Sequence, residues 1–225
     1  MKDFGLERRA DNLMLTDEIK PGIFSKIGKT LSEIHTKSLY DKKVKKKFDN
    51  SDFHEIKIKY RYYKYKQVKD PSLEKTKKDL IRKTRKNNIT FLHHDLKMNN
   101  LFIIGNNFFL IDYEGAYYGD PAIEIGLFLG HLFLYYFNQP NKKNKKIITN
   151  FWKNYITNLG FKFKEKLEYN IVKHTGFSMI YKLFGIAKQD FSFIDNHSKD
   201  KITKIAKKII GNSNIRKINQ IFEIN

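Results

Sequence analysis

The chain has 225 residues, a formal net charge of +20 at pH 7 and no cysteine. This length is enough for one domain with a hydrophobic core. The lack of cysteine excludes a disulfide framework, a thiolate metal site and a cysteine nucleophile. The charge would suit a polyanionic partner. Heavy use of Lys, Asn, Ile and Phe is also typical of A/T-rich genomes, so we interpret most of the excess charge as solvated lysines.

Targeting and membrane signals are missing from the sequence. Residues 1–9 are charged and lack the apolar centre of a secretory signal. The longest apolar run, 126–137, has 12 residues and contains His131, so it predicts a buried helix rather than a membrane span. We therefore expect a cytoplasmic protein with no membrane partner.

The first clear periodic pattern is an amphipathic helix that follows Pro21-Gly22. Between residues 23 and 34, Ile or Leu recurs at i, i+4, i+8 and i+11, which is one face of a helix. We interpret His35, just after this stripe, as a packing residue rather than a ligand.

Residues 41–88 are the least informative part of the chain. A basic run spans 42–47, Lys alternates with apolar or aromatic residues over 56–65, and 73–86 predicts a charged helix. The alternation permits a half-buried strand, and basic residues interleaved with Tyr also permit binding to single-stranded nucleic acid. We favour a variable basic insertion over 41–88, and its fold stays open.

The segment 91–114 organises the chain. It begins with a short strand and a polar loop, and then has two apolar runs, 101–104 and 108–111. The runs flank Gly105-Asn106-Asn107, which is a turn signal, so the segment predicts a β-hairpin.

Polar residues at the base of this hairpin predict a metal site. A symmetric count about Asn106 places Asn100 opposite Asp112, with Cβ atoms roughly 4.5–5.5 Å apart. By strand alternation Glu114 points to the same face as Asp112. Amide and carboxylate oxygens this close suit Mg²⁺, which takes few protein ligands and leaves room for phosphate oxygens.

The loop before the hairpin predicts a catalytic base. His93-x-Asp95-x4-Asn100, followed by a hairpin and Asp112, is the spacing of the catalytic and metal loops of kinases. Asp95 would orient an attacking hydroxyl and accept its proton. Asn100 and Asp112 would hold the metal that neutralises the transferred phosphoryl group. We interpret His93 as a loop-packing residue and assign no role to His94.

Together with Tyr118-Gly-Asp-Pro-Ala-Ile-Glu124, these motifs resemble the aminoglycoside phosphotransferase and choline kinase family, a small-molecule branch of the protein-kinase-like fold. The pattern is similar to methylthioribose kinases over 114–126 and 175–187. It differs from them at Tyr181-Lys182, where they carry two arginines, and at Asn100, where they usually have Ser, so the substrate stays open.

The resemblance implies a mainly helical α+β fold, the C-terminal lobe of a protein-kinase-like fold, with the metal site on its small β-hairpin. It implies ATP and Mg²⁺ as cofactors and a small-molecule alcohol, such as an amino alcohol, a sugar or an aminoglycoside, as substrate. Asp95 is then the catalytic base, Asn100 and Asp112 bind the nucleotide through Mg²⁺, and Glu114 holds or orients a second ion. The family also places an acid, here Glu124, against the catalytic-loop backbone; the alternative role for nearby Asp120 is a helix cap.

The rest of the chain predicts helices over 122–137, 147–159, 167–187 and 199–210.

The sequence holds no G-x-G, and no strand of the Val-Ala-Ile-Lys type precedes the first helix. Its first five residues resemble the interlobe hinge of methylthioribose kinases. We therefore interpret 1–225 as a C-terminal lobe whose N-terminal lobe is absent or supplied by a partner, and we expect weak Mg-ATP binding and little or no catalysis by this lobe alone. A catalytically inactive, pseudokinase-like interaction module is the main alternative. A basic nucleic-acid-binding protein is the weaker one.

Overall fold

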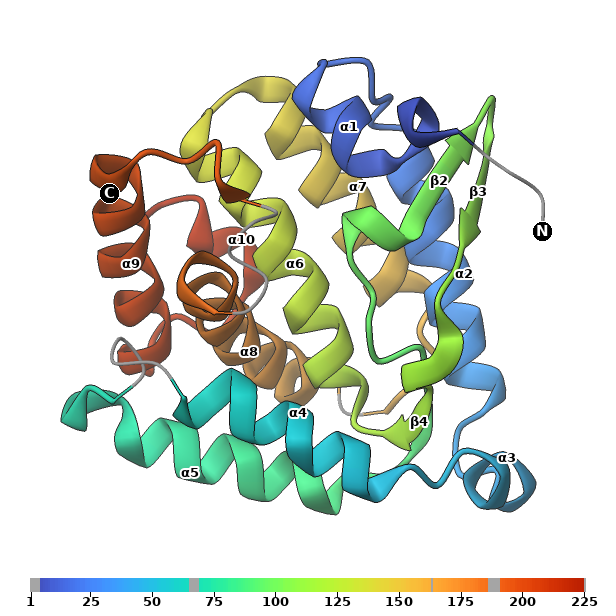
Figure 1. Ribbon diagram of the computed structural model, residues 1–225. Helices are drawn as coiled ribbons and strands as arrows, with labels where there is room; N and C mark the ends of the chain where they lie inside the picture. The colour runs from blue at the N-terminus through green and yellow to red at the C-terminus, as the bar shows by residue number, and fades with distance from the viewer. Residues whose placement is uncertain (1–4, 65–68, 163, 186–190, 225) are drawn as a thin grey trace.

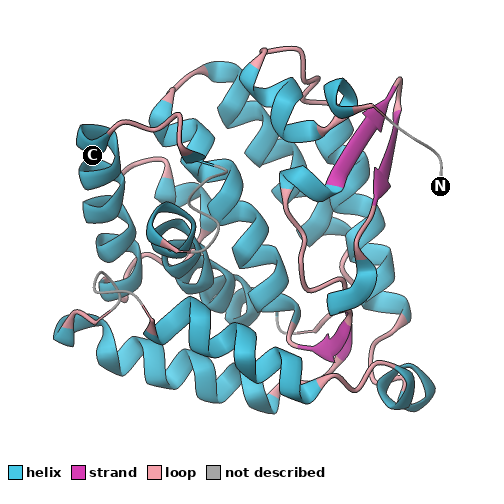
Figure 2. Cartoon of the chain, viewed as in Figure 1, coloured by secondary structure: helices cyan, strands magenta, loops and turns pink. Residues whose placement is uncertain are grey.

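A computed structural model describes residues 5–64, 69–162, 164–185 and 191–224. The chain is mainly helical, and strand structure in the described residues is confined to two antiparallel pairs (Figures 1 and 2). The elements in chain order are η1 (Leu6–Arg8), α1 (Ala10–Leu15), α2 (Ile23–Lys37), α3 (Lys42–Lys47), α4 (Ser51–Tyr63), α5 (Pro71–Lys86), β1 (Thr90–Leu92), η3 (Met98–Asn100), β2 (Leu101–Ile104), β3 (Asn107–Leu110), η4 (Tyr113–Gly115), β4 (Tyr117–Gly119), α6 (Pro121–Asn138), α7 (Lys142–Asn158), α8 (Lys164–Phe184), α9 (Asn196–Gly211) and α10 (Ile218–Ile221).

Helix α6 lies at the centre of the fold, with α8 and α7 packed against it (Figure 1). Its residues 121–135 are all buried, as the apolar run predicts. Asp120 starts the helix, because its carboxylate accepts a hydrogen bond of 2.9 Å from the backbone N–H of Ala122. Pro121 at the first helical position has no N–H to leave unpaired. The capping role of Asp120 is therefore confirmed.

Helix α8 is buried between α6 and α9, and it carries a lysine into that layer. Lys173 is 1% exposed, and its Nζ donates to the carbonyl oxygens of Ile209, Asn212 and Ile215 at 2.7, 2.7 and 3.2 Å. These carbonyls belong to the last turn of α9 and the chain that follows it. The Lys173 side chain therefore satisfies helix-end acceptors from inside the protein.

The alternating Lys/Tyr stretch forms most of helix α4, so the half-buried strand is wrong. The buried residues of α4 are His54, Ile58, Arg61 and Tyr62, which is the i, i+4, i+7, i+8 spacing of one helix face. Tyr62 is 1% exposed and hydrogen-bonds through its hydroxyl to His174 Nδ1. This tyrosine cannot stack on a nucleic acid base, which weakens the nucleic-acid hypothesis.

The two strand pairs lie on the side of the protein that carries the loop of Asp95, described below. Strand β1 pairs antiparallel with β4, and β2 pairs antiparallel with β3. Helix α2 packs on α7 and also contacts β1, so the loop that follows β1 rests on the helical core. In the described part of the chain, no helix combines the length and apolar character needed to cross a membrane.

Helices α2 and α7 approach closely at Gly28. A Cβ added there would collide with the carbonyl oxygen of Phe151 and lie 3.1 Å from the backbone N of Tyr155. We expect Gly28→Ala to lower the free energy of unfolding by about 1–3 kcal/mol, because α2 must shift away from α7. Chemical denaturation measures this.

Gly22→Ala, at the start of the same helix, is the matched control. A Cβ there would have nothing within 4 Å, and the backbone has φ −62°. The change should be neutral or stabilise by up to about 1 kcal/mol. If Gly28→Ala is as stable as the parent, the close approach of α2 and α7 does not contribute to the free energy of unfolding.

Candidate active site

His93 connects the two loops of the site. Its Nε2 donates to the carbonyl oxygen of Ile111 at 2.8 Å, and its Nδ1 accepts from the backbone N–H of Asp95 at 3.3 Å. The ring also packs edge-on against Tyr113, with centroids 4.5 Å apart. The loop after β1 is thereby fixed to the loop after β3. His93 is a packing and bridging residue, as the sequence predicts.

His94 has left-handed backbone geometry, with φ 66°. A non-glycine residue there is strained by about 1–2 kcal/mol, and its surroundings hold it in place. Its N–H donates to Glu124 Oε1 at 2.6 Å, while its carbonyl oxygen accepts from Lys57 Nζ at 3.1 Å and Arg61 Nη2 at 3.2 Å. The Nε2 atom of its buried ring lies 3.1 Å from Nδ1 of His54. The left-handed turn directs the next residue, Asp95, out of the loop.

Asp95, Asn100 and Asp112 come together at the end of the hairpin. The Asn100 Nδ2 group lies 3.0 Å from the Asp95 carbonyl oxygen, 3.2 Å from Asp95 Oδ2 and 3.5 Å from Asp112 Oδ2. With Nδ2 engaged, Oδ1 is the atom that Asn100 can offer to a cation. Three side chains with the chemistry of a base and a metal pair therefore share one small region.

The charge of Asp95 is set by opposing influences. Burial raises the pKa of its carboxyl group, but the positive charges of Lys97, Lys57 and Arg61 outweigh burial and hold the pKa below its usual range. Lys97 Nζ lies 2.9 Å from Asp95 Oδ2, and the Asp95 side chain is 31% exposed. Asp95 is thus ionised at neutral pH and reachable from solvent, as a general base requires.

The hairpin register differs by one from the expected register. Ile104 pairs with Asn107 and Leu101 with Leu110, so the turn has two residues, with Gly105 at φ 60° in its first position. Asn100 consequently faces Ile111, whose N–H donates to the Asn100 carbonyl oxygen at 3.0 Å. The prediction that Asn100 and Asp112 are paired positions is wrong.

The two side chains nevertheless meet, because Asp112 turns back. It has left-handed geometry, with φ 68° and ψ 60°, and starts the short helix η4. Glu114 lies within η4 and is exposed. Residues 112–114 are therefore not a β-strand. The prediction that strand alternation points Glu114 to the same face as Asp112 is wrong.

Comparison with family models identifies the chain. The model described as the phosphotransferase enzyme family (APH) matches residues 6–142, more than half of the sequence. The chain belongs to this phosphotransferase family. The match runs from η1 through the loop of Asp95, the hairpin and α6 to the first residue of α7. Comparison with curated proteins gives no significant match.

In this phosphotransferase, Glu124 joins the loop to the helical core. It is 1% exposed, and while Oε1 accepts from the His94 N–H, Oε2 lies 3.0 Å from His35 Nε2. The other ring nitrogen of His35 lies 2.9 Å from the Tyr155 hydroxyl. One buried chain of hydrogen bonds thus links α7, α2, α6 and the loop. The contact of Glu124 with the loop backbone and the packing role of His35 are both confirmed.

Three basic residues of the site were missed in the sequence. Lys97 belongs to the motif segment itself, and Lys57 and Arg61 come from α4, in the segment interpreted as a variable insertion. The available signal was the spacing of His54, Lys57 and Arg61 at i, i+3 and i+7, which places them on one helix face. The fold of α4 had to be known before that spacing had meaning.

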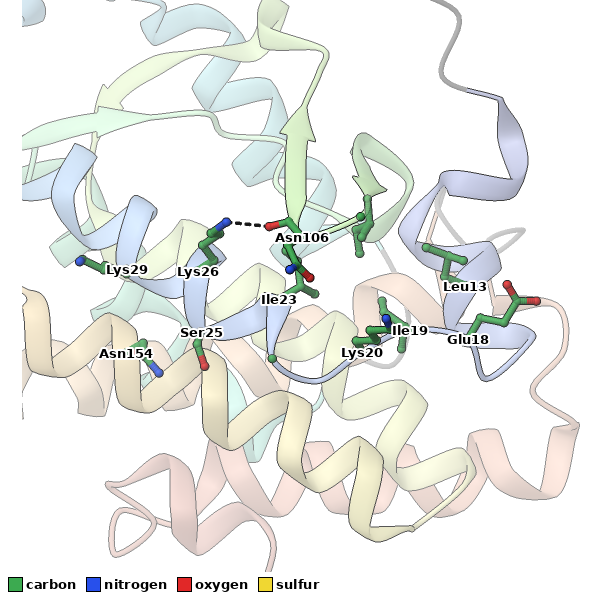
Figure 3. A pocket seen from close by; sticks show the side chains of 13 residues that line it. Leu13, Glu18, Ile19, Lys20, Ile23, Ser25, Lys26, Lys29, Asn106 and Asn154 are labelled. Atoms are coloured by element: carbon green, nitrogen blue, oxygen red, sulfur yellow. Dashed lines mark hydrogen bonds between the residues drawn. The ribbon is translucent and has the colours of Figure 1, made fainter.

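A separate groove lies elsewhere on the protein. It has a volume of about 680 Å³ and opens between α1, α2, the hairpin turn and α7, with Lys26 donating to the Asn106 carbonyl oxygen at 2.7 Å (Figure 3). Neither Asp95 nor Asp112 lines it. Asp95, Asn100 and Asp112 therefore lie outside this groove.

Among the described residues, no group of three or more His, Cys, Asp or Glu side chains is arranged to hold a metal ion. The pair formed by Asn100 and Asp112 is smaller, one amide and one carboxylate. Mg²⁺ bound to nucleotide phosphates commonly uses only one or two protein carboxylates. The donor chemistry of the pair therefore fits Mg²⁺ in the presence of a phosphate ligand.

Proposed function

We propose that this phosphotransferase moves the γ-phosphoryl group of ATP to a hydroxyl group of a small molecule. The observation that carries the proposal is the meeting of ionised Asp95 with Asn100 and Asp112, on two loops joined by His93. A base and a metal pair held this close are the parts that phosphoryl transfer needs from this side of the nucleotide. Membership of the phosphotransferase family supports the same conclusion.

In the proposed reaction, the acceptor hydroxyl donates a hydrogen bond to Asp95. Its oxygen forms a bond to the γ-phosphorus while the bond from that phosphorus to the ADP oxygen breaks, and the hydroxyl proton passes to the Asp95 carboxylate. Lys97, 2.9 Å from Asp95, holds the carboxylate in place and adds positive charge beside the transferred group.

Asn100 and Asp112 are the residues that would hold Mg²⁺. When bound, the ion neutralises charge on the phosphates. The role of Glu114 as a ligand or orienting group for a second ion stays a prediction, and its exposure on η4 leaves it accessible.

We further propose that these residues act as the C-terminal lobe of the kinase-like fold, with the opposite phosphate contacts coming from a partner or from chain beyond these 225 residues. Four large apolar side chains around the hairpin and the N-terminal segment are exposed, and they are Leu6, Phe109, Ile111 and Tyr113. An apolar surface of this kind suits contact with another lobe.

The test is transfer of label from Mg-[γ-³²P]ATP to a panel of neutral, cationic and anionic hydroxyl compounds. The panel includes glycerol, choline, ethanolamine, methylthioribose and an aminoglycoside. The 225-residue chain is assayed alone and also extended by any codons that lie in frame before Met1. We expect acceptor-dependent transfer by the extended chain that stops when Mg²⁺ is chelated, and little or no transfer by the 225 residues alone. If neither form transfers label although both bind Mg-ATP, the chain is a binding module and the proposal is wrong.

A further inference from the structure

Helix α4 presents basic side chains to the loop that carries Asp95. Lys57 and Arg61 both donate to the carbonyl oxygen of His94, the residue just before the proposed base. In Figure 1, α4 lies below this loop and the hairpin β2–β3 lies above it. Nucleotide phosphates bound at the hairpin base would leave the α4 side of the loop open to an acceptor.

The acidic residues of α4 do not balance this charge. The helix contains two of them, Asp52 and Glu55. Glu55 is turned to α5, where its carboxylate accepts from Arg85 at 2.6 and 2.8 Å, and Asp52 is exposed in the first turn. No carboxylate from α4 is therefore directed at the loop.

Among the described residues, no loop carboxylate is hydrogen-bonded to Lys57 or Arg61, whose partners are atoms of His94. Asp95 is in an ion pair with Lys97, at 2.9 Å. Burial, the nearby Arg61 and Lys97 lower the pKa of Lys57 to about 8 although Asp95 and Asp112 act in the opposite direction. Lys57 is thus still mostly protonated at neutral pH, and it is only partly buried. Its hydrogen-bond acceptor, within the described part of the chain, is the carbonyl oxygen of His94 and not a carboxylate.

The Phe53 ring, which lies on α4 beside the loop, already has a cation over its face. Lys57 Nζ already lies over the face of Phe53, 4.5 Å from the ring centroid. A quaternary ammonium or polyamine acceptor would need open aromatic faces or carboxylates at this point. It would instead meet an ammonium group.

We propose that the acceptor of this phosphotransferase carries an anionic group, a carboxylate or a phosphate, beside its reactive hydroxyl, and that Lys57 binds this group. The inference rests on the proposed function and narrows its substrate class. The reacting bonds are unchanged, since the anionic group is bound and takes no part in the transfer. Lys57 is then a specificity-determining residue. Arg61, which is 6% exposed, stabilises the loop by donating to the His94 carbonyl oxygen.

The experiment uses acceptors that share one diol and differ only in charge. Glycerol is neutral, 3-amino-1,2-propanediol is cationic, and glycerate and glycerol 3-phosphate carry a carboxylate and a phosphate. We expect kcat/KM to be highest for one of the two anions and lowest for the amine. The carboxylate and phosphate arms show which anion the site prefers. A preference for the amine would overturn the proposal.

Variants of Lys57 separate binding from loop support. Lys57→Met should raise KM for the anionic acceptors on the order of 10- to 100-fold, the size expected for a lost charge-assisted hydrogen bond. KM for glycerol should rise far less than KM for the anionic acceptors, and Lys57→Arg should restore most of the loss. Lys59→Met, which removes the same charge from the exposed side of α4, is the matched control and should match the parent. If Lys57→Met lowers kcat equally for all acceptors, or raises KM for ATP instead, Lys57 supports the loop or the nucleotide and the proposal is wrong.

A binding measurement keeps this test apart from the test of the proposed function. If no acceptor is phosphorylated, the proposed function has failed, and NMR titration with glycerol 3-phosphate and the amine in the presence of Mg-ADP still reads the charge preference. Tighter binding of the phosphate that is lost in Lys57→Met and retained in Lys59→Met supports the anion site. Equal binding of both compounds, or no effect of Lys57→Met, refutes it.

Discussion

Replacing Asp95 by Asn should lower the rate of phosphoryl transfer about 10²- to 10⁴-fold, the usual contribution of a general base. Asn has nearly the same shape, so it can keep the contact with Asn100 that the Asp95 carboxylate makes at 3.2 Å. It cannot accept the proton of the hydroxyl. The loss should therefore appear in kcat at saturating acceptor, with Mg-ATP affinity and thermal stability close to those of the parent.

The control for this variant is Asp200→Asn, which removes an exposed carboxylate from α9, far along the chain from the loop. It should transfer phosphate at the rate of the parent. If Asp95→Asn turns over within twofold of the parent, Asp95 is not the base, and the mechanism needs another proton acceptor.

Replacing Glu124 by Ala should give the largest loss of stability, about 3–5 kcal/mol in the free energy of unfolding. Glu124 is buried and serves two partners, the N–H of His94 and the ring of His35. The substitution leaves both polar groups unpaired inside the protein and also opens a cavity. It releases the left-handed loop residue as well, so transfer activity should fall together with stability.

The variant Glu124→Gln separates the effect of the hydrogen bonds from the effect of the negative charge. The Gln amide oxygen can accept from the His94 N–H, and its NH₂ group can donate to His35 Nε2 if that ring carries its proton on Nδ1, toward Tyr155. Its stability should lie much nearer the parent than that of Glu124→Ala, as measured by urea denaturation. Equal and large losses in both variants would mean that the negative charge, rather than the hydrogen bonds, holds the loop.

The proximity of the proposed catalytic and metal residues could be predicted from sequence because local spacing governs it. A strand, a short loop and a tight hairpin leave little freedom, so Asp95, Asn100 and Asp112 had to fall near one another. The register could not be read with the same certainty. Gly105 takes positive φ at the first turn position, which makes a two-residue turn, and Asp112 then uses left-handed geometry to bring its side chain back. Two backbone conformations compensate for the shift of one residue.

The structure of helix α4, in contrast, could not be predicted from local spacing. Its apolar residues alternate with lysines, which is the period of a strand. The buried face also contains His54 and Arg61, which a hydropathy pattern counts as polar. Their burial depends on the loop carbonyl and the His94 ring that receive them, and these partners are 30 or more residues away in sequence. Tertiary contacts therefore decided the structure of this segment, and the basic side of the site was hidden with it.

Lys173, described above as the buried lysine that satisfies the end of α9, offers a chemical reporter of motion. Acylating reagents modify exposed amines directly, but they reach an amine that is 1% exposed and bonded to three carbonyl oxygens only when α8 and α9 separate. The chain has 38 lysines, and labelling of most of them reports surface exposure, whereas labelling of Lys173 reports openings of the α8–α9 layer. Mass spectrometry of that single amine would time these openings without any added probe.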